Sequence, residues 1–219
     1  MNKFEIITSQ INSYKDKGMR LFVTSSFQTH SIPLLHIISR IDKNIPVYYL
    51  NTGYLFPETL SFKDELSSIL GLEFIGVESQ IPKSQQRDRN GQLFFTSDPD
   101  YCCYLNKTQA LEPVLLSNDV WINGIRADQN ANRAAMSVEE KTPQGALRYH
   151  PMLDWTSKEI FQYRKEFGLP AHPMEAKGYL SIGCEPCTRK MVGENDERTS
   201  RWFGMNKVEC GLHTDLIKK

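Results

Sequence analysis

The chain has 219 residues, of which 40% are apolar, enough for one compact α/β domain or for a domain with a functional tail. Lysine plus arginine and aspartate plus glutamate balance at 26 each, which argues against a general nucleic-acid-binding protein but leaves room for local clusters that bind a small anion. No apolar run approaches the length of a membrane span, and the polar N-terminus lacks the apolar core of a signal peptide. We therefore expect a cytoplasmic protein, with neither membrane nor nucleic acid as a partner, whose cysteines serve a metal or catalysis.

Short strand-like runs alternate with longer helical patterns along residues 1–149, which predicts a parallel sheet flanked by helices. Helices are predicted over residues 2–17, 33–41 and 58–70, and strands over residues 19–24, 46–50, 72–77 and 120–124. The first helix carries Phe4, Ile7, Ile11 and Tyr14 at helical spacing. This first part is predicted to form the α/β core of one continuous domain.

A helix-rich part with an irregular tail is predicted over residues 150–219. Thr156 and Glu159 have the spacing of a capping box, which marks the start of a helix. After Gly168, glycines, prolines, cysteines and charges replace any clear periodicity. We interpret that stretch as a mobile tail that builds a site against the core.

Four of the five cysteines form two close pairs, Cys102 with Cys103 and Cys184 with Cys187. Adjacent side chains on a strand point to opposite faces, so the first pair can share a site only on a bent or helical backbone. Four thiolates suit a [4Fe–4S] cluster or a structural zinc, and the spacing does not choose between them. Each pair alone is also consistent with a redox pair, half of a zinc site or simply buried thiols.

The fifth cysteine, Cys210, lies near the C-terminus beside a glycine and close to His213. A reactive thiol needs nearby positive charge to stabilise its thiolate. Four residues close in sequence could provide it: Arg198, Arg201, Lys207 and His213. From composition alone, a surface thiol without function is equally consistent with this position.

Three predicted strands end in residues suited to an anionic ligand, and ligands of open α/β sheets bind beyond the carboxyl ends of the strands. Backbone N–H groups and the following helix favour phosphate there, although a hydroxyl-rich turn alone is a weak signal and lacks the glycines of a Walker loop. The convergence of three such ends is more informative than any one of them. The predicted crevice residues are Ser25, Ser26, Phe27, Leu50, Asn51, Thr52, Gly53, Gly124 and Arg126.

Three further cations could bind the anionic group. Arg198 and Arg201 are three residues apart, so on a helix they reach the same side, where guanidinium groups suit sulfate or phosphate. A solvated charged helix is the alternative for this segment. Lys107 follows Cys103 by four residues, one turn away if the segment is helical.

Taken together, these segments resemble the assimilatory adenylyl-sulfate and phosphoadenylyl-sulfate reductases over nearly the whole chain. The resemblance is carried, in order, by VTSSFQTHS, YYLNTGYLFPETL, DYCCYLNKTQALEP, INGIRADQNANRA, HPMLDWTSKEIFQY, YLSIGCEPCTRK and DERTSRWFGMNKVECGLH. Their order and spacing make the match specific.

The resemblance implies an adenine-nucleotide α-hydrolase-like fold and a [4Fe–4S] cluster that acts electrostatically. It implies that Cys210 attacks the sulfate sulfur, expels AMP and leaves an S-sulfocysteine, which thioredoxin or a glutaredoxin then cleaves to sulfite. It also assigns the cluster ligands and the phosphosulfate contacts. The ligands are Cys102, Cys103, Cys184 and Cys187, and the contacts are Lys107, Arg126, Arg198 and Arg201.

The four cysteines resemble the branch that uses adenylyl sulfate. Many members of that branch carry acidic residues after the serine turn, whereas this chain has Gln28 and Ser31 there. Without those carboxylates a 3′-phosphate is better tolerated, so use of phosphoadenylyl sulfate, alone or with adenylyl sulfate, stays open.

Two other classes of protein compete with this interpretation. An ATP-dependent adenylating enzyme of the same broad fold would need a glycine-rich SGGxDS loop, which is missing, and would not need Cys210. A metal-stabilised, non-catalytic nucleotide-binding module would make that thiol dispensable. We expect an external reductant, because 219 residues leave no room for a thioredoxin-like domain, and the sequence leaves the oligomeric state, a homo-oligomer included, open.

Overall fold

The computed structural model describes residues 2–191, 200–202, 204–205, 207, 209–214 and 216. Its centre is a six-stranded sheet in the order β3-β2-β1-β4-β6-β5. The strands are β1 (Leu21–Thr24), β2 (Val47–Leu50), β3 (Phe74–Val77), β4 (Val120–Asn123), β5 (Glu139–Lys141) and β6 (Leu147–Tyr149). All neighbours run parallel except β5, which pairs antiparallel with β6. The predicted α/β fold with a parallel sheet flanked by helices, and its four predicted strands, are confirmed, whereas the antiparallel β5–β6 edge was not predicted.

The strand order reverses between β1 and β4. The chain proceeds from β1 to β2 and β3 on one side and then crosses back to β4 on the other, with Thr24 opposite Asn123 in the register. At such a reversal the connections leave in opposite directions and open a crevice at the carboxyl ends of the strands. The fold therefore provides a binding crevice where the sequence predicted one.

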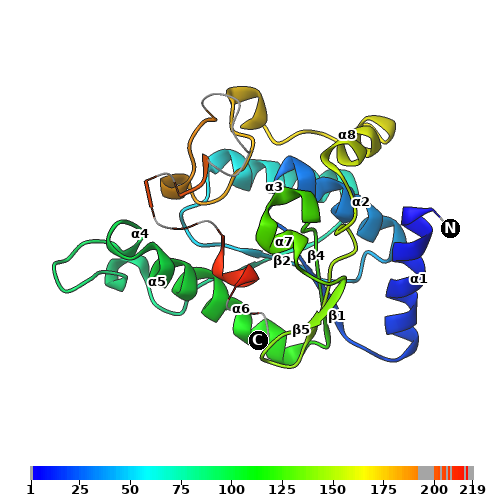
Figure 1. Cartoon of the computed structure of the whole chain (residues 1–219), viewed down its shortest axis with the longest axis horizontal. Coiled ribbons are helices and arrows are strands. Elements are labelled where there is room, and N and C mark those ends of the chain that lie inside the picture. Colours follow the sequence, from blue (N-terminus) through cyan, green and yellow to red (C-terminus); the bar gives the residue numbers. More distant parts are fainter. Residues whose placement is uncertain are drawn as a thin grey trace.

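Helices cover both faces of the sheet, and the strand side chains alternate accordingly. Val23 and Ile122 face a core made with α1 (Lys3–Asp16), α2 (Ile32–Ile41), α3 (Pro57–Leu70) and α8 (Ser157–Glu166). In Figure 1 these helices form the upper and right-hand part of the molecule. Phe22 and Trp121 face the opposite side, where α6 (Gln109–Ser117) packs. The predicted capping box of Thr156 and Glu159 is present at the start of α8.

The cysteine pair at 102–103 lies on a helical path that leads into α6. It runs through α4 (Phe94–Ser97), α5 (Pro99–Cys103) and the π-helical turn η3 (Tyr104–Thr108). Helices α4 and α5 project to the left in Figure 1. The helical backbone that a shared site required is therefore present. The remaining short helices are η1 (Thr29–Ser31), η2 (Lys83–Gln85), η4 (Ala127–Gln129), α7 (Ala131–Ala134), η5 (Glu175–Lys177), η6 (Glu185–Cys187) and η8 (Gly211–His213).

The C-terminal residues that the structure describes pack against the core. Leu216 is 1% exposed and joins the cluster around Phe22 and Trp121. Arg148 stacks over the Trp121 ring and contacts His213 Nδ1 at 3.0 Å. The predicted mobility of this tail stays a prediction. The leucines through which it packs on the sheet are too few to form a pattern in the sequence. Among the described residues, no helix is long and apolar enough to cross a membrane.

Candidate active site

The main cleft lies at the carboxyl ends of β1, β2 and β4 and encloses about 1180 Å³, part of it open to solvent. Its walls come from the turn after β1, the ends of β2 and β4, η3 and the C-terminal segment. Of the predicted residues, it brings together Ser25, Ser26, Phe27, Leu50, Thr52, Lys107, Gly124, Arg201 and Cys210.

The turn after β1 presents backbone and hydroxyl groups rather than an aromatic ring. Phe27 has a φ of 56°, a left-handed conformation that costs a non-glycine residue about 1 kcal/mol or more. Its ring is 1% exposed and packs on Tyr49 and Phe74, which holds the strained backbone in place. Ser25 Oγ accepts the Phe27 N–H at 3.1 Å. The predicted contact of Phe27 with a ligand would therefore be made by its backbone and not by its ring.

Gln28 links this turn to the C-terminal segment. Its side-chain Nε2 donates to Ser26 Oγ at 3.1 Å, and its Oε1 accepts the backbone N–H of Ile182 at 2.9 Å. Ser31 Oγ lies 3.3 Å from Ser26 Oγ. Gln28 and Ser31, which come after the serine turn and line the cleft, thus present neutral polar groups to it.

The thiol of Cys210 lies at the cleft wall, half-buried, and its backbone N–H donates to Glu209 Oε1 at 2.8 Å. The turn η8 that follows packs on η3, which carries Lys107. Burial lowers the pKa of the Lys107 ammonium, but neighbouring cysteine thiolates, that of Cys210 among them, outweigh this effect and raise the pKa above its ordinary value. The predicted nucleophile and a protonated lysine therefore share one wall.

Arg201 is 8% exposed and held by the loop that carries the C-x-x-C pair. Its guanidinium donates to the carbonyl oxygens of Ile182 and Cys187 at 3.2 and 3.3 Å and stacks over the Trp202 ring. A Cβ at Gly183 would overlap this guanidinium, so a larger residue there would displace it. Arg198, its predicted partner, lies outside the described residues.

The other four cysteines line a second cavity of about 310 Å³ next to the cleft. Cys102 and Cys103 come from α5, and Cys184 and Cys187 from the turn around η6, which a bridge between Leu55 and Cys184 holds against the end of β2. All four side chains are buried and free of disulfides. Among the described residues, no three His, Cys, Asp or Glu side chains form a group that could hold one metal ion.

Polar groups surround these sulfurs. Thr52 Oγ1 lies 3.3 Å from Cys184 Sγ, and Asn106 Nδ2 lies 3.6 Å from Cys102 Sγ. Burial, together with the neighbouring thiols, raises the pKa of Cys102 to about 12 and that of Cys187 to about 11. Burial therefore keeps the Cys102 and Cys187 thiols protonated at neutral pH in the absence of a ligand. The polar groups beside the sulfurs suit thiolates that ligate a cluster.

Three predicted contacts do not lie on the cleft wall. Arg126 is 1% exposed, and its Nε donates to Asp128 Oδ1 at 2.9 Å and its Nη2 to Ser157 Oγ at 2.8 Å. Asn51 bonds Glu78 through its amide. Gly53, in a left-handed turn, lies outside the cleft lining as well. The ion pair with Asp128 and the burial of Arg126 hold this arginine off the cleft lining, while its Nη1 has no hydrogen-bond partner among the described residues. Its predicted contact with the phosphosulfate stays a prediction.

The phosphoadenosine phosphosulfate reductase domain family matches residues 20–190. The chain belongs to this family. A relative from Chelativorans sp. (strain BNC1), named adenosine 5′-phosphosulfate reductase, is 36% identical over 95% of this chain and 84% of its own length. A relative from Gloeobacter violaceus (strain ATCC 29082 / PCC 7421), named phosphoadenosine 5′-phosphosulfate reductase, is 34% identical over 90% and 83%. The phosphoadenylyl-sulfate reductase of Candida auris, solved as a phosphate complex, shares the fold with a TM-score of 0.70, at 18% identity over 84% of this chain and 89% of that one.

The predicted membership in this reductase family and its α/β fold are confirmed, and the chain is thereby an oxidoreductase of the sulfonucleotide type. Among the polar residues of the cleft that the sequence did not predict are Asn123, Gln129 and Arg133. Asn123 is the last residue of β4 and is 3% exposed. Neither its Nδ2 nor its Oδ1 has a hydrogen-bond partner among the described residues. Arg133 stands seven residues after Arg126 in the same segment, and only the turn between them decides which one faces the cleft.

Proposed function

We propose that this chain reduces adenylyl sulfate to sulfite and AMP for sulfate assimilation, with Cys210 as the nucleophile. One observation carries the proposal: the half-exposed Cys210 thiol lines the same cleft as the serine turn and as Lys107 and Arg201. A phosphate-binding turn, two cations and a thiol are the groups that this chemistry requires. The relatives named adenosine 5′-phosphosulfate reductase support the choice of reaction.

In the first step the Cys210 thiolate attacks the sulfate sulfur. A sulfur–sulfur bond forms, the bond from sulfur to the bridging phosphate oxygen breaks, and AMP leaves with the electron pair. The product on the enzyme is an S-sulfocysteine. Lys107 and Arg201, with Arg198, would neutralise the charge that develops on the leaving phosphate.

In the second step a dithiol protein of the thioredoxin or glutaredoxin type attacks the Cys210 sulfur. Sulfite leaves, Cys210 passes into a mixed disulfide, and the second thiol of the partner releases it as a thiolate while the partner becomes a disulfide. The two electrons thus come from the external dithiol. A cytoplasmic location, where such reductants are kept reduced, is consistent with this step.

The nucleotide would lie across the switch point of the sheet. The Ser25–Ser26 hydroxyls and the backbone at Phe27 suit the phosphate, and Leu50 and Thr52 lie at the end of β2, where the adenine would lie. The amide of Asn123, buried and unpaired in the described part of the chain, offers one donor and one acceptor to a bound molecule.

The residues around the second cavity fit a [4Fe–4S] cluster. Cys102, Cys103, Cys184 and Cys187 would be its ligands, and Asn106 would stabilise one thiolate through the contact described above. When bound, the cluster would act electrostatically on the neighbouring cleft and form a rigid link between α5 and the C-terminal segment. The chain itself contributes the two helical and turn segments that bring the thiols to one cavity.

Phosphoadenylyl sulfate is the second candidate substrate. Gln28 and Ser31 replace acidic residues near the expected ribose, so a 3′-phosphate meets neutral groups. The relative from Gloeobacter violaceus, named for the phosphorylated substrate, adds support.

The test is a single turnover without reductant. Incubation with adenylyl sulfate should add one SO₃ group, about 80 Da by its atomic masses, to the peptide that contains Cys210, because no dithiol is present to remove it. Cys210→Ser should show no adduct and no sulfite release. Turnover by Cys210→Ser with thioredoxin, or an adduct on Cys102 or Cys187, would show that another thiol is the nucleophile.

A further inference from the structure

A buried ion pair lies directly beside the nucleophile. Glu209 is 4% exposed and Arg133 is 6% exposed. Arg133 Nε donates to Glu209 Oε2 at 2.9 Å, and its Nη2 donates to Glu209 Oε1 at 3.2 Å, so the guanidinium and carboxylate meet in a two-bonded fork. Such a pair is costly to bury and survives only when its remaining hydrogen bonds are made.

Both oxygens of Glu209 accept a second hydrogen bond. Asn130 Nδ2 donates to Oε2 at 2.8 Å, and the backbone N–H of Cys210 donates to Oε1 at 2.8 Å. Asn130 also caps α7, since its side chain accepts the Arg133 N–H. The carboxylate therefore ties the backbone of the nucleophile to the first turn of α7.

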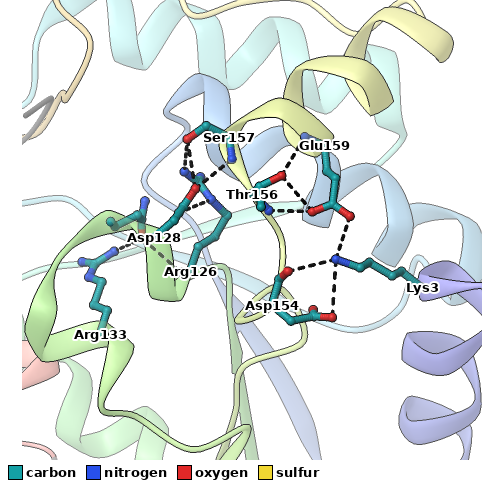
Figure 2. A network of polar contacts seen from close by, with 9 residues as sticks. Lys3, Arg126, Asp128, Arg133, Asp154, Thr156, Ser157 and Glu159 are labelled. Carbon is teal, nitrogen blue, oxygen red and sulfur yellow. Dashed lines mark hydrogen bonds and ion pairs between the residues drawn. The ribbon is translucent and has the colours of Figure 1, made fainter.

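Arg133 is held in turn by a network that reaches α8. Its Nη1 donates to Gln129 Oε1, which also accepts the Arg126 N–H at 3.0 Å. Figure 2 shows Arg126 and Asp128 joined to Ser157 at the start of α8, with Arg133 beyond them. Arg126 thus acts through the turn η4, whose Gln129 orients the guanidinium that receives Glu209. A rigid guanidinium defines one position for the carboxylate, and hence for the next residue, Cys210.

We propose that Glu209 is a positioning residue that, through Arg133, seats the Cys210 backbone at the cleft. The effect of this contact on catalysis rests on the function proposed above, whereas the position that the contact gives to the Cys210 backbone does not. Loss of the pair should free the segment around Cys210 from α7. The thiol then meets a bound sulfonucleotide in the correct geometry less often. A displacement of about 1 Å is enough to slow such reactions about a hundredfold.

Hydrogen–deuterium exchange and single-turnover kinetics on the full chain with its cofactor test the proposal. The variants are Glu209→Gln, Arg133→Met and the double variant, which leaves no unpaired buried charge and so keeps the experiment decisive if a single variant unfolds. The matched control is Glu65→Gln, which removes one exposed carboxylate of α3 outside the cleft lining.

We expect exchange at the amides of residues 209–214 to rise at least tenfold in all three variants, with the thermal midpoint of the double variant near that of the wild type. Formation of the Cys210 adduct should slow at least tenfold while the dissociation constant for adenylyl sulfate changes less than threefold. The double variant should be no worse than the worse single variant, because the two residues act as one unit.

Wild-type exchange and wild-type adduct formation in the folded double variant would overturn the proposal. If the wild type forms no adduct with either nucleotide, the proposed function fails, and the exchange of residues 209–214 still decides whether Glu209 and Arg133 seat this segment.

Discussion

The sheet core and the C-terminal segment around residues 178–216 are held together by different means. In the core, fully buried side chains such as Phe22, Val23 and Ile122 alternate along short strands and pack on helices. The C-terminal segment is held by individual contacts that reach back to distant elements, among them a bridge from Leu55 to Cys184 and the pair of Arg133 with Glu209. The core is redundant, since many apolar contacts share the stabilisation, whereas each contact of the C-terminal segment has a separate task.

This difference places the chemistry where the packing is least redundant. Cys184, Arg201 and Cys210 all belong to the C-terminal segment, and the core contributes mainly the ends of its strands. A substitution in the core should therefore lower the free energy of unfolding with modest effects on geometry, while one in the segment should alter geometry and activity. The experiments below test this contrast, from the largest expected effect to the smallest.

The largest effect should come from the thiols of the second cavity. Cys184→Ser should abolish iron binding and bleach the brown colour of anaerobically prepared protein, because a four-iron cluster needs all four thiolates. Iron and zinc analysis with a visible absorption spectrum measures this. Cys210→Ser is the matched control, since it removes a thiol of the cleft and should retain the iron. Stoichiometric zinc without iron in the wild type would show that the site is a zinc site.

A large but incomplete loss should follow when Arg201 is changed. Arg201→Lys keeps the charge but loses the planar fork, so kcat/KM should fall about a hundredfold, or about 2.7 kcal/mol of transition-state stabilisation. Gly183→Ala should cause a comparable loss with Arg201 still present, because the added Cβ displaces the guanidinium. Arg189→Lys, at an exposed position next to the bridge of Thr188 with Arg201, is the control and should change kcat/KM less than twofold. Equal effects of Arg189→Lys and Arg201→Lys would contradict a specific role.

The same contrast decides how much the sequence could predict. The strands and the helices of the core have periodic apolar residues, so the order of elements and even the capping box of Thr156 were predicted correctly. The convergence of Ser25, Leu50 and Gly124 also followed from the rule that parallel strands end at one edge. Such features depend on neighbours in the sequence or on the general geometry of a sheet.

Features that depend on single distant contacts were missed. Arg126 and Arg133 stand in the same segment, and nothing in their spacing reveals that Asp128 and Ser157 retain the first while the second faces the cleft. The buried carboxylate of Glu209 likewise has its partners 76 and 79 residues away. The division of the chain at residue 150 and the individual roles of the site residues stay predictions.

A moderate effect on stability is expected at His172, which precedes the C-terminal segment and contacts Thr59 of α3. The ring Nδ1 accepts the Met174 N–H, so the neutral ring carries its proton on Nε2 and donates to Thr59 Oγ1. Burial lowers the pKa of His172 to about 4. The unfolded chain therefore binds a proton between pH 6.5 and 4 that the folded chain does not, and stability falls as the pH drops through this range.

At pH 5 the penalty from this one ring is about 2 kcal/mol. Denaturant unfolding at pH 7.5 and pH 5.0 should show that His172→Gln loses less stability on acidification than the wild type, by about that amount. His36→Gln, a half-buried histidine of α2, is the control and should change the pH dependence less. An identical pH dependence for the wild type and His172→Gln would mean that the folded protein accommodates the protonated ring.

The smallest effect should be on nucleotide choice, where both regions contribute a wall. We expect adenylyl sulfate to have the higher kcat/KM, but by less than tenfold, about 1.4 kcal/mol, because Gln28 and Ser31 present neutral groups to a 3′-phosphate. Gln28→Glu should widen the preference several-fold, because its carboxylate repels the added phosphate. The carboxylate can still accept the Ile182 N–H, and the bond with Ser26 can reverse so that the hydroxyl donates. Gln109→Glu adds the same charge at an exposed position of α6 and should leave the ratio of the two kcat/KM values unchanged.

A wild-type preference of tenfold or more for the 3′-phosphorylated nucleotide would reverse the assignment of substrate. An unchanged ratio in Gln28→Glu would mean that the 3′-phosphate does not lie near this side chain.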